Sequence, residues 1–86
     1  MSSVRDTSLL AYQELEPVLG VRQQTVFAML RAGVEMTNME LSRALGWSVN
    51  RVTPRVFELR RLGFVVVGGK RQCLVTGRLA YSWRCR

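Results

Sequence analysis

Residues 37–52 read TNMELSRALGWSVNRV, and this run contains the start and end of one helix and the start of the next. Thr37 and Glu40 have the spacing of a capping box, in which each side chain accepts a hydrogen bond from the backbone N–H of the other residue. Gly46 suits the left-handed conformation that ends a helix, and Ser48 is a favourable N-cap for a new one. The sequence therefore predicts two short helices joined by a very short turn.

Two helices joined in this way must cross at a steep angle, which is the helix-turn-helix arrangement. The second helix is predicted over about residues 49–62, where Val52, Val56 and Leu59 recur on one face as a buried stripe does. Pro54 lies within this pattern. We therefore expect either a tight or kinked opening turn, or a helix that begins at Pro54 itself.

Two further helices are predicted before this pair. The first covers residues 8–16 and forms an N-terminal extension, assigned to residues 1–20. Its apolar stripe either packs on the domain or makes a homodimer contact. The second covers about residues 21–32 and ends at Gly33. Its apolar face is the expected scaffold of the core and consists of Val26, Phe27, Met29 and Leu30.

A β-hairpin is predicted after the helices. Residues 64–67 have the β-branched composition of a buried strand, and we expect the strand to continue to Cys73 past a bulge at Gly68-Gly69. Residues 76–78 suit a turn, and residues 79–83 alternate large and small side chains as a returning strand does. The large side chains of this strand share one face, which we expect to be the core side: Leu79, Tyr81 and Trp83.

Charge is distributed unequally along the 86 residues, whose net charge is +7. Residues 1–40 carry three basic and five acidic side chains, whereas residues 41–86 carry ten basic and one acidic, and nine of those ten are arginine. Such a concentration favours a polyanionic partner through counterion release. The planar fork of arginine also suits phosphates and guanine edges. A basic face that is merely solvated is the alternative interpretation.

Cysteine and histidine usage argues against several classes of site. The chain has no histidine, and Cys73 and Cys85 alone cannot form a four-ligand zinc site or a Cys/His nucleophile pair. We therefore expect no metal, no cofactor and no enzymatic activity. The cysteines are expected to be reduced structural thiols; the alternative is a disulfide if they face each other, which a cytosolic setting disfavours. The chain also has no apolar run that could span a bilayer, and its start lacks the features of a secretory signal. We expect a cytoplasmic protein without a membrane partner.

From Val21 to Arg84, the order of three helices and a basic hairpin resembles the winged helix-turn-helix family of bacterial and phage regulators. The run VRQQTV, residues 21–26, is similar to the opening of the SOS-repressor DNA-binding domain. The run ELSRALGWSVNRV, residues 40–52, is similar to the helix-turn-helix core of the family. The tail resembles the wing of small phage and prophage proteins through KRQC at 70–73, TGRLA at 76–80, and Trp83.

The resemblance implies an α+β winged helix-turn-helix domain over residues 21–86, with a three-helix core, a C-terminal β-hairpin wing and a short extra helix before it. Family DNA contacts would fall on the second helix of the pair and on the wing. Ser42 and Pro54 depart from residues that the family often has there. The expected DNA-binding set is Ser48, Asn50, Arg51, Thr53, Arg55, Lys70, Arg71 and Arg78.

Two classes of function follow from these patterns. The leading prediction is a transcriptional regulator or phage accessory factor that binds duplex DNA through the helix at about residues 49–62 and the basic wing. The alternative is a protein-interaction module, such as an antirepressor or an inhibitor of a host factor. Such a module would dock the same basic face on an acidic host or phage protein. The sequence does not name the DNA site or the oligomeric state.

Overall fold

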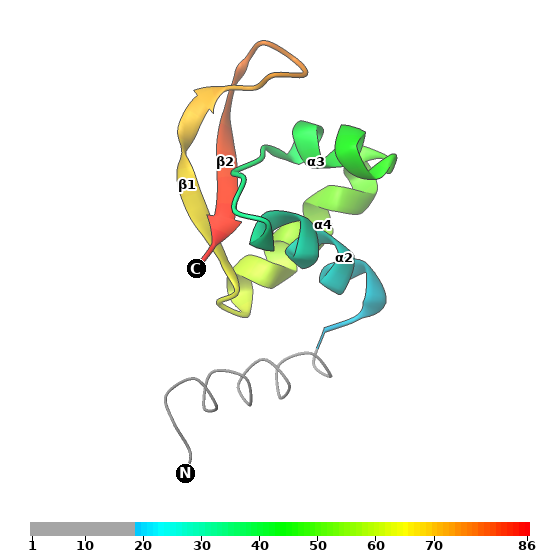
Figure 1. The fold of residues 1–86 in the computed structure, drawn as a ribbon. Coiled ribbons are helices and arrows are strands. Elements are labelled where there is room, and N and C mark those ends of the chain that lie inside the picture. The colour runs from blue at the N-terminus through cyan, green and yellow to red at the C-terminus, as the bar shows by residue number, and fades with distance from the viewer. Residues whose placement is uncertain (1–18) are drawn as a thin grey trace.

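Three helices and one antiparallel hairpin follow one another in the computed structural model, which describes residues 19–86 (Figure 1). The elements are α2 (Val21–Arg31), α3 (Asn38–Leu45), α4 (Val49–Arg61), β1 (Val65–Gln72) and β2 (Leu79–Cys85). The helix predicted at residues 8–16 lies outside the described residues, and the division at residue 20 remains a prediction. Among the helices that the structure describes, none is long and apolar enough to cross a membrane.

The capping signals around α3 act as the sequence predicts. The Thr37 hydroxyl accepts a hydrogen bond from the Glu40 N–H at 3.2 Å, and the Glu40 carboxylate accepts one from the Thr37 N–H at 3.0 Å. Gly46 ends the helix with a φ of 70°, a conformation that costs glycine little. Ser48 occupies the N-cap position of α4 without a side-chain cap bond. The turn between α3 and α4 is therefore as short as expected.

α4 is one continuous helix although Pro54 lies inside it. The expectation that the helix begins at Pro54 is therefore wrong. The other expectation, a tight opening turn, is confirmed: the N–H groups of Arg51 and Val52 both donate to the Ser48 carbonyl, at 3.0 and 3.2 Å. The Arg51 bond is of the 3₁₀ type, which tightens the first turn. Packing of the buried stripe outweighs the hydrogen bond that the proline removes.

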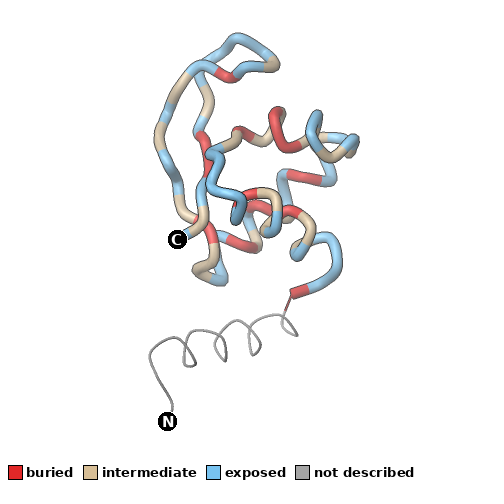
Figure 2. Tube along the Cα trace, in the orientation of Figure 1, coloured by how far each residue is buried: buried red, intermediate tan, exposed pale blue. Residues whose placement is uncertain are grey.

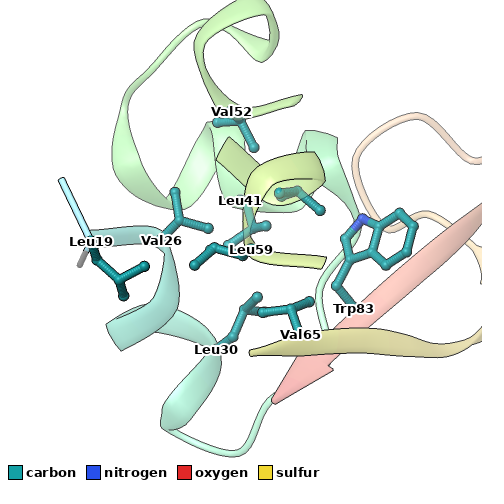
Figure 3. Packing of buried hydrophobic residues seen from close by; sticks show 9 residues of the cluster. Leu19, Val26, Leu30, Leu41, Val52, Leu59, Val65 and Trp83 are labelled. Carbon is teal, nitrogen blue, oxygen red and sulfur yellow. The ribbon is translucent and has the colours of Figure 1, made fainter. Parts of the chain in front are cut away.

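One apolar core joins the helices to the hairpin (Figures 2 and 3). Helix and hairpin side chains point toward one another there, and each is at most 7% exposed; the main contributors are Val26, Leu30, Leu41, Val52, Val56, Leu59, Val65 and Trp83. The buried stripe predicted for α4 is confirmed. The spacing of Leu41, Ala44 and Leu45 predicts that all three face inward, but Ala44 is exposed. The face of α3 that meets the core is narrow and consists of Leu41 and Leu45, which lie one turn apart.

β1 and β2 pair antiparallel, with a register shift between Val67 and Gly69. Gly68 is therefore the extra residue of a bulge, as the Gly-Gly pair predicts. Met36 forms an isolated antiparallel bridge with Trp83, on the edge of β2 that does not face β1. The two residues exchange backbone hydrogen bonds of 3.2 and 2.9 Å. This bridge ties the segment before α3 to β2.

The far end of the hairpin projects beyond the helices (Figure 1). Leu79, Tyr81 and Trp83 were all expected to face the core, but only Trp83 is buried. Tyr81 is 55% exposed and Leu79 is 69% exposed. Tyr81 and Trp83 do share a face, because their ring centroids lie 6.1 Å apart, but burial does not alternate along the strand, since Ser82 is buried as well. The core covers only the part of this face near Trp83. The hairpin end is left in solvent with its side chains available for contacts.

Replacement of Pro54 by alanine should stabilise the domain. Pro54 is exposed, so the substitution removes no core contact, and it restores an N–H that can donate to the Asn50 carbonyl. The gain in helix stability outweighs the added freedom of the unfolded chain, and we expect a net increase of about 1–2 kcal/mol in the free energy of unfolding. Urea unfolding measures this value. An unchanged or lower stability would contradict the account of α4.

Candidate nucleic-acid interface

The first turn of α4 presents exposed polar side chains. Ser48, Asn50, Arg51 and Thr53 are all exposed there, so the structure brings four of the predicted DNA-binding residues together. The Arg51 guanidinium lies over the Trp47 ring, 5.5 Å from its centroid. This cation–π contact steadies the arginine at the surface without pairing it to a carboxylate.

Arg55 has a partner within the protein. Its Nε and Nη2 atoms donate to the two carboxylate oxygens of Glu58 at 2.8 and 2.9 Å, and Gln23 of α2 donates to the same carboxylate at 2.7 Å. The hydrogen bonds from Arg55 and then Gln23 lower the pKa of Glu58. Arg55 therefore lies on the α2 side of α4, and it would have to leave Glu58 to bind a base. The i, i+3 spacing of this pair was a signal already present in the sequence.

Arg71 is also bound within the protein, at the junction of α3 and the hairpin. Its Nη1 and Nη2 atoms donate to Glu40 Oε2 and Oε1 at 2.8 and 2.7 Å. The Leu74 N–H donates to Glu40 Oε2 at 2.8 Å, and the Thr37 N–H completes four hydrogen bonds to this one buried carboxylate. Arg71 thus fixes the hairpin to α3. Sequence reasoning identified Glu40 only as a capping residue.

These contacts keep Glu40 charged. The hydrogen bonds from Arg71 lower the pKa of Glu40 from 4.5 to about 2; burial acts in the opposite direction, and the Leu74 and Thr37 N–H groups add to the lowering. Thr37, the other half of the capping box, also reaches the hairpin, because its hydroxyl lies 3.0 Å from the Cys73 sulfur. Both capping residues of α3 therefore contact the hairpin.

The other two predicted cations of the hairpin are exposed. Lys70 lies opposite Tyr81 in the sheet, and its Nζ is 5.7 Å from the centroid of the Tyr81 ring. Arg78 lies in the turn, where its N–H donates to the Thr76 hydroxyl at 3.2 Å. Both side chains project from the part of the hairpin that the helices do not cover.

Asn38, which sequence reasoning missed, links the hairpin to α4. Its amide oxygen accepts a 2.8 Å hydrogen bond from the Trp83 indole N–H. Its amide nitrogen donates to the Thr53 hydroxyl at 3.3 Å. These bonds connect residues that are 45 and 15 positions apart, so no local pattern could reveal them. They hold Trp83 of the hairpin and Thr53 of α4 in a fixed relation.

The later turns of α4 carry a second group of exposed side chains that the prediction also missed. Arg61 lies over the Phe57 ring, 5.9 Å from its centroid, and Arg60 lies over the Trp83 ring at 4.7 Å. Phe57 is 55% exposed and Val67 is 46% exposed. A hollow of about 410 Å³ between α4 and β1 is lined by Phe57, Arg60, Arg61, Val65, Val66 and Val67.

The arrangement matches that of a solved protein. The crystal structure of a mutant of MarR from E. coli superposes with a TM-score of 0.62, over 100% of this chain and 67% of the MarR chain, at 16% sequence identity. The chain has a winged-helix fold. The predicted α+β class, with three helices followed by a hairpin wing, is thus confirmed. No family model and no curated protein matches the sequence.

In this winged helix, α3 and α4 form the helix-turn-helix pair, and β1 and β2 form the wing. Within residues 19–86, no three His, Cys, Asp or Glu side chains are grouped so that they could hold a metal ion. Cys73 is buried and Cys85 is half-buried, and both are free thiols. The candidate site is therefore a surface of amide, hydroxyl, guanidinium and aromatic groups.

Acid should weaken the fold through Glu40. Because its pKa is lower in the folded chain than in the unfolded chain, its contribution is complete above about pH 4.5 and is lost as the pH falls toward 2. We expect this one group to remove about 2 kcal/mol from the free energy of unfolding between about pH 6 and about pH 3. Urea unfolding of Glu40→Gln should lack that component. Glu35→Gln is the matched control and should retain it; equal pH profiles for all three proteins would contradict the assignment.

Proposed function

We propose that this winged-helix domain is a DNA-binding transcription regulator that inserts α4 into the major groove of duplex DNA. The observation that carries the proposal is the first turn of α4, where Asn50 and Arg51 are exposed while Val52 anchors the turn in the core. In a helix-turn-helix, the N-terminal residues of the second helix contact base edges. The exposed polar turn is therefore where this domain would recognise a sequence.

The side chains of this turn suit distinct groups of the duplex. The Asn50 amide matches the donor and acceptor of adenine, and the Arg51 guanidinium matches the two acceptors of guanine. The hydroxyls of Ser48 and Thr53 suit phosphate oxygens or base edges. The Asn38 amide donates a hydrogen bond to the Thr53 hydroxyl. The Thr53 hydroxyl would therefore meet the DNA in one orientation.

The wing would supply further positive charge to the same duplex. Lys70 and Arg78 are exposed and would neutralise phosphates along the backbone. Arg55 and Arg71, which were expected to contact DNA directly, are each bound to a carboxylate in the free domain. We propose that Arg71 acts by positioning the wing, and that Arg55 contacts DNA only if the duplex displaces Glu58.

The finer parts of the sequence-based hypothesis remain predictions. These are a role in a phage, the resemblance to the SOS-repressor domain, a cytoplasmic location and a homodimer formed through the N-terminal extension. The alternative function, docking of the basic face on an acidic host or phage protein, also predicts binding that weakens with salt. It does not predict a preference among duplex sequences, so sequence preference distinguishes the two functions.

Binding to duplex DNA should depend steeply on salt. With about five phosphate contacts, the logarithm of the association constant should fall against the logarithm of the salt concentration with a slope of about −4.5. Fluorescence anisotropy with a labelled duplex of about 30 base pairs measures this slope. A flat titration between low and moderate salt would rule out the proposed function.

Arg51 should contribute to sequence-specific binding. Arg51→Ala should weaken binding to a selected duplex by about 1–3 kcal/mol, or roughly 5- to 150-fold, because a guanine contact is lost. Arg22→Ala removes the same charge from the exposed surface of α2 and is the matched control. Anisotropy on selected and scrambled duplexes separates the effects. An equal loss on both duplexes would make Arg51 a phosphate contact, and an equal loss in both variants would leave it without a specific role.

A further inference from the structure

The outward ridge of α4 has an apolar centre. Asn50, Pro54, Phe57 and Arg61 follow one another at i, i+4, i+7 and i+11, so they lie on one face of the helix. All four are exposed, whereas the stripe on the opposite face is buried. The ridge therefore presents an amide at one end, a guanidinium at the other, and two apolar side chains between them.

The two apolar residues are costly or unnecessary for the fold itself. Pro54 removes a hydrogen bond from the middle of α4, and its exposed ring fills no part of the core. Phe57 is 55% exposed and is not among the residues that pack in the core. Arg61 lies over the Phe57 ring, 5.9 Å from its centroid, and the ring borders the hollow between α4 and β1. The ridge has features of a binding surface that stability alone does not require.

The chemistry of the major groove indicates what an apolar ridge could contact. Base pairs present hydrogen-bond donors and acceptors there, and the apolar group among them is the C5-methyl of thymine. A phenyl ring is among the side chains that make this contact. From Asn50 to Arg61 the helix rises about 16 Å, which spans several base pairs, so the centre of the ridge would face base pairs between those met by its two ends.

We propose that Pro54 and Phe57 contact thymine methyl groups in the major groove and that Phe57 determines a preference for thymine at the centre of the recognised site. This inference rests on the proposed function, because it requires that α4 enter the groove. It adds a specificity determinant that the polar turn at Asn50 and Arg51 does not supply. The duplex would be read by hydrogen bonds at the start of α4 and by an apolar contact two turns later.

The test removes only the methyl groups. A duplex is first selected with the wild-type chain from a random pool, and it is then resynthesised with deoxyuridine in place of thymidine at each position in turn. Base pairing is unchanged by this replacement. Loss of the methyl group from the central thymine should raise the dissociation constant about fourfold. This is the ratio that corresponds to the free energy of burying one CH₂ group. Anisotropy measures the ratio of the two dissociation constants.

Variants assign the effect to the ridge. Phe57→Ala should bind the thymine and uracil duplexes equally, whereas Phe57→Leu, which keeps an apolar contact, should retain most of the ratio. Leu62→Ala is the matched control, because Leu62 is 48% exposed at the end of α4 but lies off the ridge, and it should keep the full ratio. Circular dichroism confirms that each variant is folded.

The outcomes separate this inference from the proposed function. If a duplex is selected and wild-type binding does not depend on any thymine methyl, the inference is overturned and the proposed function stands. It is also overturned if Phe57→Ala weakens binding to the thymine and uracil duplexes by the same factor, because the ratio of the two dissociation constants is then unchanged. If no duplex is enriched and binding is insensitive to salt, both proposals fail.

Discussion

The buried carboxylate of Glu40 is the contact on which the geometry of the site depends. It caps α3 through the Thr37 N–H, pairs with Arg71 of β1 and accepts the Leu74 N–H in the turn of the wing. A buried charge is stable only when it is paired and hydrogen-bonded, and here its partners come from both halves of the domain. The helix-turn-helix and the wing are thereby joined at one point. A second tie, from Trp83 through Asn38 to Thr53, fixes α4 to the same hairpin.

Carboxylate pairing also decides which arginines are available at the surface. Arg55 and Arg71 form two-point contacts with glutamates, and such contacts favour the bound orientation of a guanidinium fork. Arg51 and Arg61 lie over aromatic rings instead. A ring contact holds the face of the guanidinium group and leaves the N–H groups at its edge free to form hydrogen bonds. The surface proposed for DNA is therefore built from the arginines that no glutamate holds in a fork.

Local signals in the sequence determined the elements of the fold. The capping box, the left-handed Gly46, the buried stripe of α4 and the bulge at Gly68 each depend on residues a few positions apart, so their physical causes are visible in a short window. The exposed turn at Asn50 and Arg51 was predicted for the same reason. The Arg55–Glu58 pair is equally local, and its spacing could have predicted that Arg55 is held within the protein.

Features that depend on distant segments were decided only by the tertiary structure. The exposure of Tyr81 depends on where the helices stop covering the sheet, and that of Ala44 on which face of α3 meets the core. The Glu40–Arg71 pair joins residues 31 positions apart. Sequence by itself determined the helices, the hairpin and the excess of positive charge, because these follow from short-range preference and composition. Packing decided which of the charged side chains face outward, because only the folded chain brings Arg71 to its distant carboxylate and leaves residues such as Lys70 and Arg78 in solvent.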